Sequence, residues 1–121
     1  MNAIAHANDE VDPLDQRRIA ELKRLRNGSL LAQLIAGFSE QGEREVAALR
    51  AASEARRFQE GAMLAHSLKS SSMNIGAQLV GIICRRIEGD MLSERAEDLA
   101  MLCGELETSF RETMAALHAQ A

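Results

Sequence analysis

The chain lacks tryptophan and tyrosine, and its 121 residues include three phenylalanines and one proline. Runs that alternate between apolar and polar residues, which are typical of half-buried strands, are also missing. Alanine, leucine, glutamate, arginine and methionine are abundant instead, and these residues are good helix formers. The composition therefore favours an all-α protein.

Long apolar runs and an excess of basic residues are absent as well. Because no apolar stretch approaches the ~18 residues of a membrane span, we expect no membrane insertion. The net charge is −4, whereas nucleic-acid binders normally present a basic face, so we expect no nucleic-acid partner. Residues 1–11, which include His6, have no apolar run and are expected to form a tail rather than a signal peptide. Residues 12–121 are long enough for one domain with its own core.

The two cysteines, Cys84 and Cys103, form no Cys-x-x-Cys pair and have no metal-ligand spacing with a histidine. Both lie within apolar helical patterns. We therefore expect two buried free thiols in preference to a disulfide, and no metal site. A reducing cytoplasm suits such a chain.

Hydrophobic spacing predicts a first helix with Asp12 as N-cap and Pro13 at its first position, ending at Asn27-Gly28. Ser29 is expected to cap a second helix, after which the chain turns back near residues 51–56.

Three further helices are predicted. One covers about residues 56–73, and the next follows Gly76 and slackens at residues 89–90. The last has apolar residues at alternating steps of four and three: Leu92, Ala96, Leu99, Cys103, Leu106, Phe110, Thr113 and Leu117. Short connections between long amphipathic helices favour an up-down-up-down antiparallel four-helix bundle, with the N-terminal helix as an additional element.

His66 stands on the third helix, about 120° away from the apolar stripe by helical geometry, which directs it to the outside of the bundle. Lys69 follows three residues later and is its neighbour on the helix surface. Ser70 lies close to His66 on the other side. Serines are mediocre mid-helix residues, so a run of three here has no evident folding benefit.

The run from residue 65 to 77, A-H-S-L-K-S-S-S-M-N-I-G-A, resembles the signature of histidine-containing phosphotransfer (HPt) domains. The resemblance implies an all-helical phosphorelay intermediate of two-component signalling. It assigns the phosphoacceptor role to His66, neutralisation of phosphate charge to Lys69, and shaping of the site to Ser70, Ser71 and Gly76. Met73 is expected to be an apolar contact for a partner helix.

The chemistry agrees with this resemblance, because a neutral imidazole has a nucleophilic ring nitrogen that can attack an aspartyl phosphate. The sequence has no Gly-rich nucleotide loop and no acidic cluster for Mg²⁺. We therefore expect a phosphocarrier rather than an enzyme, with no cofactor of its own. Receiver domains or a hybrid sensor histidine kinase are the expected partners, and the receiver is expected to supply the aspartate and the Mg²⁺.

Two residues depart from the commoner pattern of the family. Ser70 replaces a glycine, and Glu88 stands where a glutamine is frequent; we leave Glu88 outside the site, because an acidic side chain beside phosphohistidine is unhelpful. Two alternatives remain open. One is a helical interaction module that has lost phosphotransfer. The other is the phosphoacceptor hairpin of a sensor kinase, which forms a four-helix bundle only as a dimer. We expect instead a monomer that closes its own core.

Overall fold

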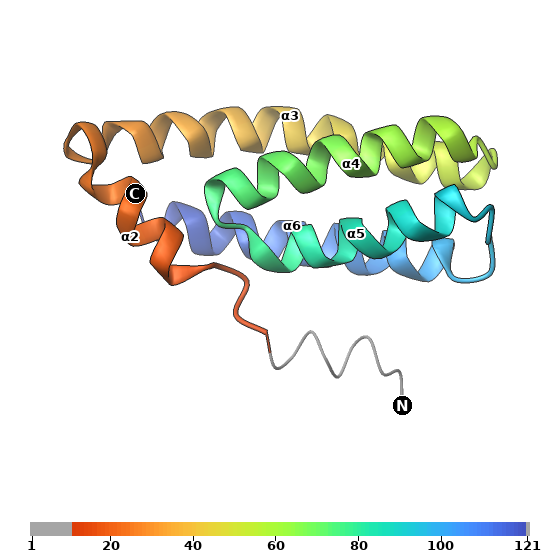
Figure 1. The fold of residues 1–121 in the computed structure, drawn as a ribbon. Helices are drawn as coiled ribbons and strands as arrows, with labels where there is room; N and C mark the ends of the chain where they lie inside the picture. The colour runs from red at the N-terminus through yellow and green to blue at the C-terminus, as the bar shows by residue number, and fades with distance from the viewer. Residues whose placement is uncertain (1–10, 121) are drawn as a thin grey trace.

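The computed structural model describes residues 11–120, and within this range it contains five α-helices and one short 3-10 segment. In chain order these are α2 (Gln16–Arg24), η1 (Leu25–Gly28), α3 (Ser29–Glu54), α4 (Phe58–Ile75), α5 (Gln78–Leu92) and α6 (Leu99–His118). Four long helices, α3 to α6, form the body of the molecule, and α2 lies at one end (Figure 1). The predicted all-α, four-helix architecture is confirmed. Residues 1–10 of the predicted tail lie outside the described residues.

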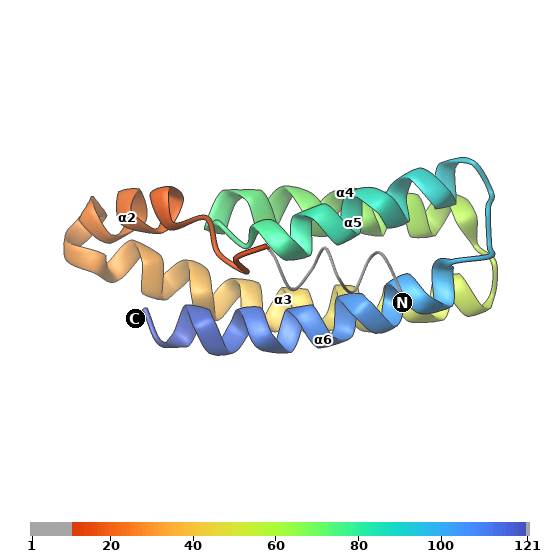
Figure 2. The ribbon, with the colours of Figure 1, turned by 90° about the horizontal axis from the view of Figure 1, so that it is seen from below.

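The four long helices close on themselves around one core. Helix α3 packs against α4 and α6, and α5 packs against the same two helices (Figure 2). Each of the five α-helices buries an apolar stripe, with Ile19, Leu49, Leu68, Ile87 and Leu106 as nearly inaccessible members from α2 to α6 in turn. Because the core is closed on all sides, functional groups have to stand on its outer surface.

Both cysteines are buried and free, as predicted. Burial raises the pKa of the Cys84 thiol to about 12, and it also raises the pKa of Cys103. Thiols held in the protonated form are poor nucleophiles and poor metal ligands. The two cysteines are therefore packing residues.

The predicted start of the first helix is wrong by three residues. Helix α2 begins at Gln16, and its N-cap is Asp15, whose carboxylate accepts hydrogen bonds from the backbone amides two and three residues later. The carboxylate of Asp12 instead accepts from the amide two residues on, at 2.9 Å, in a local turn before the helix. The amide of Asp15 donates to the carbonyl of Gly76 at 2.7 Å. This tie to the α4–α5 connection keeps the segment around Pro13 out of the helix.

The junction between α2 and α3 also differs from the prediction. Helix α2 ends at Arg24, and Arg26, Asn27 and Gly28 all have positive φ angles of 53°, 55° and 86°. Left-handed residues cannot continue a right-handed helix, so the chain reverses here. Ser29 is the first residue of α3 rather than its cap, and its hydroxyl donates to the carbonyl of Arg26 at 2.8 Å.

The boundary between α5 and α6 also differs from the prediction. Helix α5 continues through residues 89–90 without slackening, and Leu92 is its last residue, with 70% of its surface exposed. Glu94 has a φ of 54° and ends the helical path. Leu92 and Ala96 therefore lie outside α6, which begins at Leu99. The spacing of four and three runs across this turn by coincidence.

Gly42 lies in the interior of α3, and close packing explains why a glycine stands there. A β-carbon at this position would lie 2.6 Å from Cζ of Phe110 on α6. That ring is buried and also packs against Phe38, with 5.5 Å between the ring centroids. The absence of a side chain at Gly42 therefore lets α3 and α6 approach each other.

Replacement of this glycine tests the packing. Gly42→Ala gains about 1 kcal/mol of helix propensity, but we expect a net loss of stability, because overpacking costs about 1–3 kcal/mol. Gly37→Ala in the same helix is the matched control, since nothing lies within 4 Å of its β-carbon position. This control is expected to be as stable as the parent or more stable in urea denaturation followed by circular dichroism. A Gly42→Ala variant that gains as much stability as Gly37→Ala would contradict the assigned contact.

Candidate functional site

His66 lies on the outward side of α4. The buried positions of this helix are Gly61, Ala62, Ala65, Leu68, Ser72 and Ile75. The His66 side chain is 62% exposed. The imidazole therefore faces solvent, in the direction that helical periodicity indicates.

A carboxylate from the neighbouring helix bridges His66 and Lys69. Glu88 on α5 places one oxygen 2.9 Å from Nδ1 of His66 and the other 2.6 Å from Nζ of Lys69. The Glu88 and Lys69 side chains are 17% and 28% exposed. The prediction that Glu88 lies outside the site is therefore wrong, because this residue contacts both His66 and Lys69. Its alignment with the family's glutamine was the signal that pointed to it.

The contacts of Glu88 with Lys69 and His66 favour the ionised form of its carboxyl group. The hydrogen bond from Lys69 is the main reason that the pKa of the Glu88 carboxyl lies below its ordinary value. Partial burial opposes this shift, and the contact with His66 reinforces it. The carboxylate is therefore ionised at neutral pH, and it can accept hydrogen bonds but cannot donate them.

An ionised acceptor next to Nδ1 selects the tautomer of the ring. Nδ1 must carry the proton that Glu88 accepts, and in the neutral imidazole the lone pair then belongs to Nε2. The same hydrogen bond also fixes the orientation of the ring. The site thus presents one nitrogen nucleophile, Nε2, on the surface of the bundle.

A shallow groove of about 620 Å³ lies between α4 and α5 beside this site. Its lining residues are Lys69, Ser70, Met73, Gly81, Ile82 and Arg85. Met73 and Ile82 are 61% and 46% exposed, so the groove combines apolar surface with two cationic side chains. Such a mixture is typical of a protein interaction surface.

The three serines after Lys69 face three different environments. Ser70 is exposed and lines the α4–α5 groove. The hydroxyl of Ser71 donates to the carbonyls of Ser67 and Leu68, and its side chain lines a small hollow against α3. Ser72 is fully buried and donates to the carbonyl of Leu68 at 2.6 Å. The structure therefore brings only Ser70 of the three to the surface beside the histidine.

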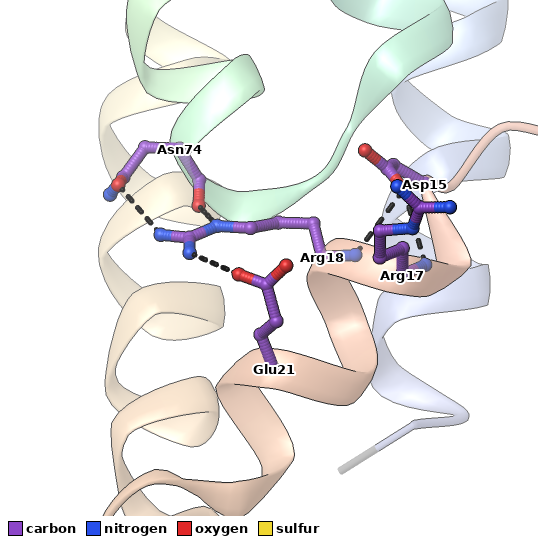
Figure 3. Close-up of polar contacts among 5 residues, drawn as sticks. All are labelled: Asp15, Arg17, Arg18, Glu21 and Asn74. Carbon is purple, nitrogen blue, oxygen red and sulfur yellow. Dashed lines mark hydrogen bonds and ion pairs between the residues drawn. The ribbon is translucent and has the colours of Figure 1, made fainter.

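Gly76 lies at the far end of α4, about 15 Å along the helix axis from His66. Its φ of 85° ends α4, and its carbonyl accepts from Asp15. Nearby, Arg18 donates to the backbone and side-chain oxygens of Asn74, at 2.8 and 3.2 Å (Figure 3). The motif residues Asn74 and Gly76 thus fasten α2 to the bundle and do not contact the imidazole.

Within residues 11–120 there is no group of three or more His, Cys, Asp or Glu side chains placed to hold a metal ion. Among the same residues, no helix is both long and apolar enough to cross a membrane.

The fold is a four-helix bundle, and its site is one oriented imidazole on the surface, with no enclosed active site. These features are typical of domains that carry a chemical group on a histidine. Residues 33–120 match the family model described as Hpt domain, and the chain belongs to this family. Hpt domains are phosphocarriers rather than enzymes, so the chain has a phosphotransfer role in two-component signalling.

The fold is similar to a solved structure of the same kind. The crystal structure of histidine-containing phosphotransfer protein B (HptB) from Pseudomonas aeruginosa PAO1 superposes with a TM-score of 0.84. The two sequences are 24% identical, and the alignment covers 91% of this chain and 95% of HptB. This likeness shows the fold. Comparison with curated protein sequences finds no match to this chain.

Acidification tests the electrostatics of the Glu88 contacts. The ordinary pKa of a glutamate is about 4.5, and that of folded Glu88 is lower. The contacts therefore stabilise the fold fully above the unfolded pKa, and this contribution is lost as the pH falls through the folded pKa. We expect Glu88→Gln to be about 0.5–1 kcal/mol less stable than the parent at pH 7, and this difference should shrink towards pH 3.

Urea denaturation at several pH values measures this difference. Glu43→Gln, at an exposed position of α3, controls for the loss of one negative charge. A gap between the parent and Glu88→Gln that widens as the pH falls below about 4.5, where the carboxyl group takes up its proton, would show that the sign is wrong.

Proposed function

We propose that this chain is a phosphorelay intermediate in which His66 accepts a phosphoryl group from one receiver-domain aspartate and passes it to another. The observation that carries this proposal is the 2.9 Å contact between Nδ1 of His66 and Glu88, made by a ring that is 62% exposed. The scaffold is an up-down-up-down antiparallel four-helix bundle over residues 12–121, with α2 as its additional N-terminal helix.

The transfer uses the lone pair on Nε2. This nitrogen attacks the phosphorus of the aspartyl phosphate, an N–P bond forms, and the P–O bond breaks as the aspartate carboxylate leaves with the electron pair. The Nδ1 proton stays between the ring and Glu88 throughout. The phosphorylated ring gains positive charge, which the adjacent carboxylate stabilises. Glu88 therefore helps because it lies on the Nδ1 side of the ring, away from the phosphoryl group.

Lys69 supplies positive charge beside the ring. Phosphoryl transfer has a loose transition state, so positioning and charge neutralisation provide most of the catalysis. The ammonium group of Lys69 is held by Glu88 at 2.6 Å, which fixes its place on the same face as the imidazole. We assign it the neutralisation of phosphate charge.

The α4–α5 groove is the proposed contact for a receiver domain. Ser70 shapes the groove beside the imidazole, and Met73 offers an exposed apolar side chain two helical turns from His66. Ser71 and Gly76 act on the site through the position of α4, the first by its bonds within the helix and the second by ending it. The receiver brings the aspartate and the Mg²⁺.

The partners in this proposal are receiver domains, a hybrid sensor histidine kinase, or both. We expect a monomer, because four long helices close the core without a second copy. We expect a cytoplasmic location, because a reducing compartment suits two free cysteines. Its net charge of −4 does not favour a nucleic-acid partner.

Replacement of the histidine tests the acceptor. Phosphorylated receiver domains from the same organism should label the parent chain on His66, giving a product that is labile in acid and stable in base. His66→Gln should abolish the label. His118→Gln, at the exposed histidine near the end of α6, is the control and should retain it. Label that persists in His66→Gln would exclude His66 as the acceptor.

The positioning role of Glu88 predicts an order of rates. Glu88→Gln keeps an oxygen that accepts the Nδ1 proton but loses the negative charge that stabilises the phosphorylated ring, so its transfer rate should lie between those of the parent and Glu88→Ala. Glu88→Ala removes the acceptor, and we expect transfer to slow about tenfold, which corresponds to about 1.4 kcal/mol. Rapid-quench measurement of phosphoryl transfer distinguishes the variants, with circular dichroism as the check on folding. Equal rates for Glu88→Ala and the parent would show that the ring needs no orientation.

A further inference from the structure

A second groove lies on the α3–α4 face of the bundle. It has a volume of about 530 Å³ and is lined by Glu45, Gln59, Glu60, Met63, Leu64 and Ser67. Met63 precedes His66 by three residues on α4, so the two are neighbours on the helix surface. The groove therefore borders the surface that a partner of His66 covers.

The groove contains a buried carboxylate. Glu45 is 5% exposed, and its Oε1 atom has no hydrogen-bond partner among the described residues. Helical spacing explains the burial, because Glu45 lies between the core positions Gly42 and Leu49 on α3. A buried charged oxygen is costly unless an opposite charge or a donor satisfies it. Glu45 thus has a buried oxygen for which the described residues supply no hydrogen-bond partner.

The rest of the groove indicates what would complete it. None of the residues that line it is basic. The other carboxylate, Glu60, is exposed and already pairs with Arg57 at 2.9 Å. Met63 is 71% exposed, and with the half-buried Leu64 it gives the groove an apolar wall. A ligand with an apolar stem and a cationic end matches both features, and lysine and arginine side chains have this form.

We propose that this groove binds a lysine or arginine side chain of the receiver domain that docks over His66. The aliphatic stem packs on Met63 and Leu64, and the cationic group pairs with Glu45. This proposal rests on the proposed function for the identity of the partner. The site itself depends on the burial and the charge of Glu45.

A small cation tests the site without the partner. We expect n-butylguanidinium, titrated into the full chain, to give saturable amide shifts at Met63, Leu64 and Ser67 in two-dimensional NMR spectra. Glu45→Gln should abolish these shifts, whereas Glu60→Gln, at the exposed carboxylate of the same groove, should keep them. Glu45→Met serves as a second variant if the amide disturbs folding, which thermal unfolding will show.

Three results would overturn the site. If neutral n-butanol gives the same shifts, the groove is merely apolar. If n-butylguanidinium gives no saturable shift, or binds Glu45→Gln as well as the parent, then Glu45 is not a cation site.

A kinetic experiment tests the occupant. For a receiver domain that labels the parent chain, Glu45→Gln should raise the half-saturating concentration at least fivefold and leave the maximal rate unchanged. Labelling of His66 by phosphoramidate should be equal in both chains, because Glu45 does not contact the ring. An unchanged half-saturating concentration would exclude the receiver side chain. Failure of every donor to label His66 would instead overturn the proposed function, while the NMR result would still stand.

Discussion

The carboxylate of Glu88 joins the two halves of the functional site, and the packing of α4 on α5 makes this contact possible. A β-carbon at Gly61 would lie 2.5 Å from Sδ of Met91, so the two helices approach closely one turn beyond Glu88. That approach fixes how α5 lies against α4, and it places one oxygen on His66 and the other on Lys69. The orientation of the ring, the place of the ammonium group and the ionisation of the carboxylate all depend on it.

This arrangement is consistent with a carrier that does not act alone. Before phosphorylation the negative charge of Glu88 is balanced by Lys69, and the neutral imidazole adds none. A phosphoryl group brings about two negative charges at pH 7, which one lysine cannot balance. In the proposed function, the metal ion of the receiver domain balances the remainder, so the group moves only when the two proteins are together. An exposed nitrogen without an enclosing pocket suits such an exchange.

The surface around His66 differs in charge on the two sides of α4. The α4–α5 groove has Lys69 and Arg85, whereas the α3–α4 groove has Glu45 and Glu60. Exposed methionines lie next to both, and methionine adapts readily to different partner surfaces. In the proposed complex with a receiver domain, the apolar residues provide contact area, and the opposite charges of the two grooves determine the orientation in which the partner docks.

The sequence by itself determined that the chain is helical, that four long helices share one core, and that a histidine and a lysine stand together on the surface of the third. These features follow from the period of 3.6 residues, which every helix imposes on its own residues. Packing between helices, and not the local pattern, decided the turn between α5 and α6, where Glu94 adopts a positive φ although it is not glycine. It also decided that Glu88 reaches His66, because 22 residues separate them along the chain and only the packing of α5 on α4 brings their side chains within 2.9 Å.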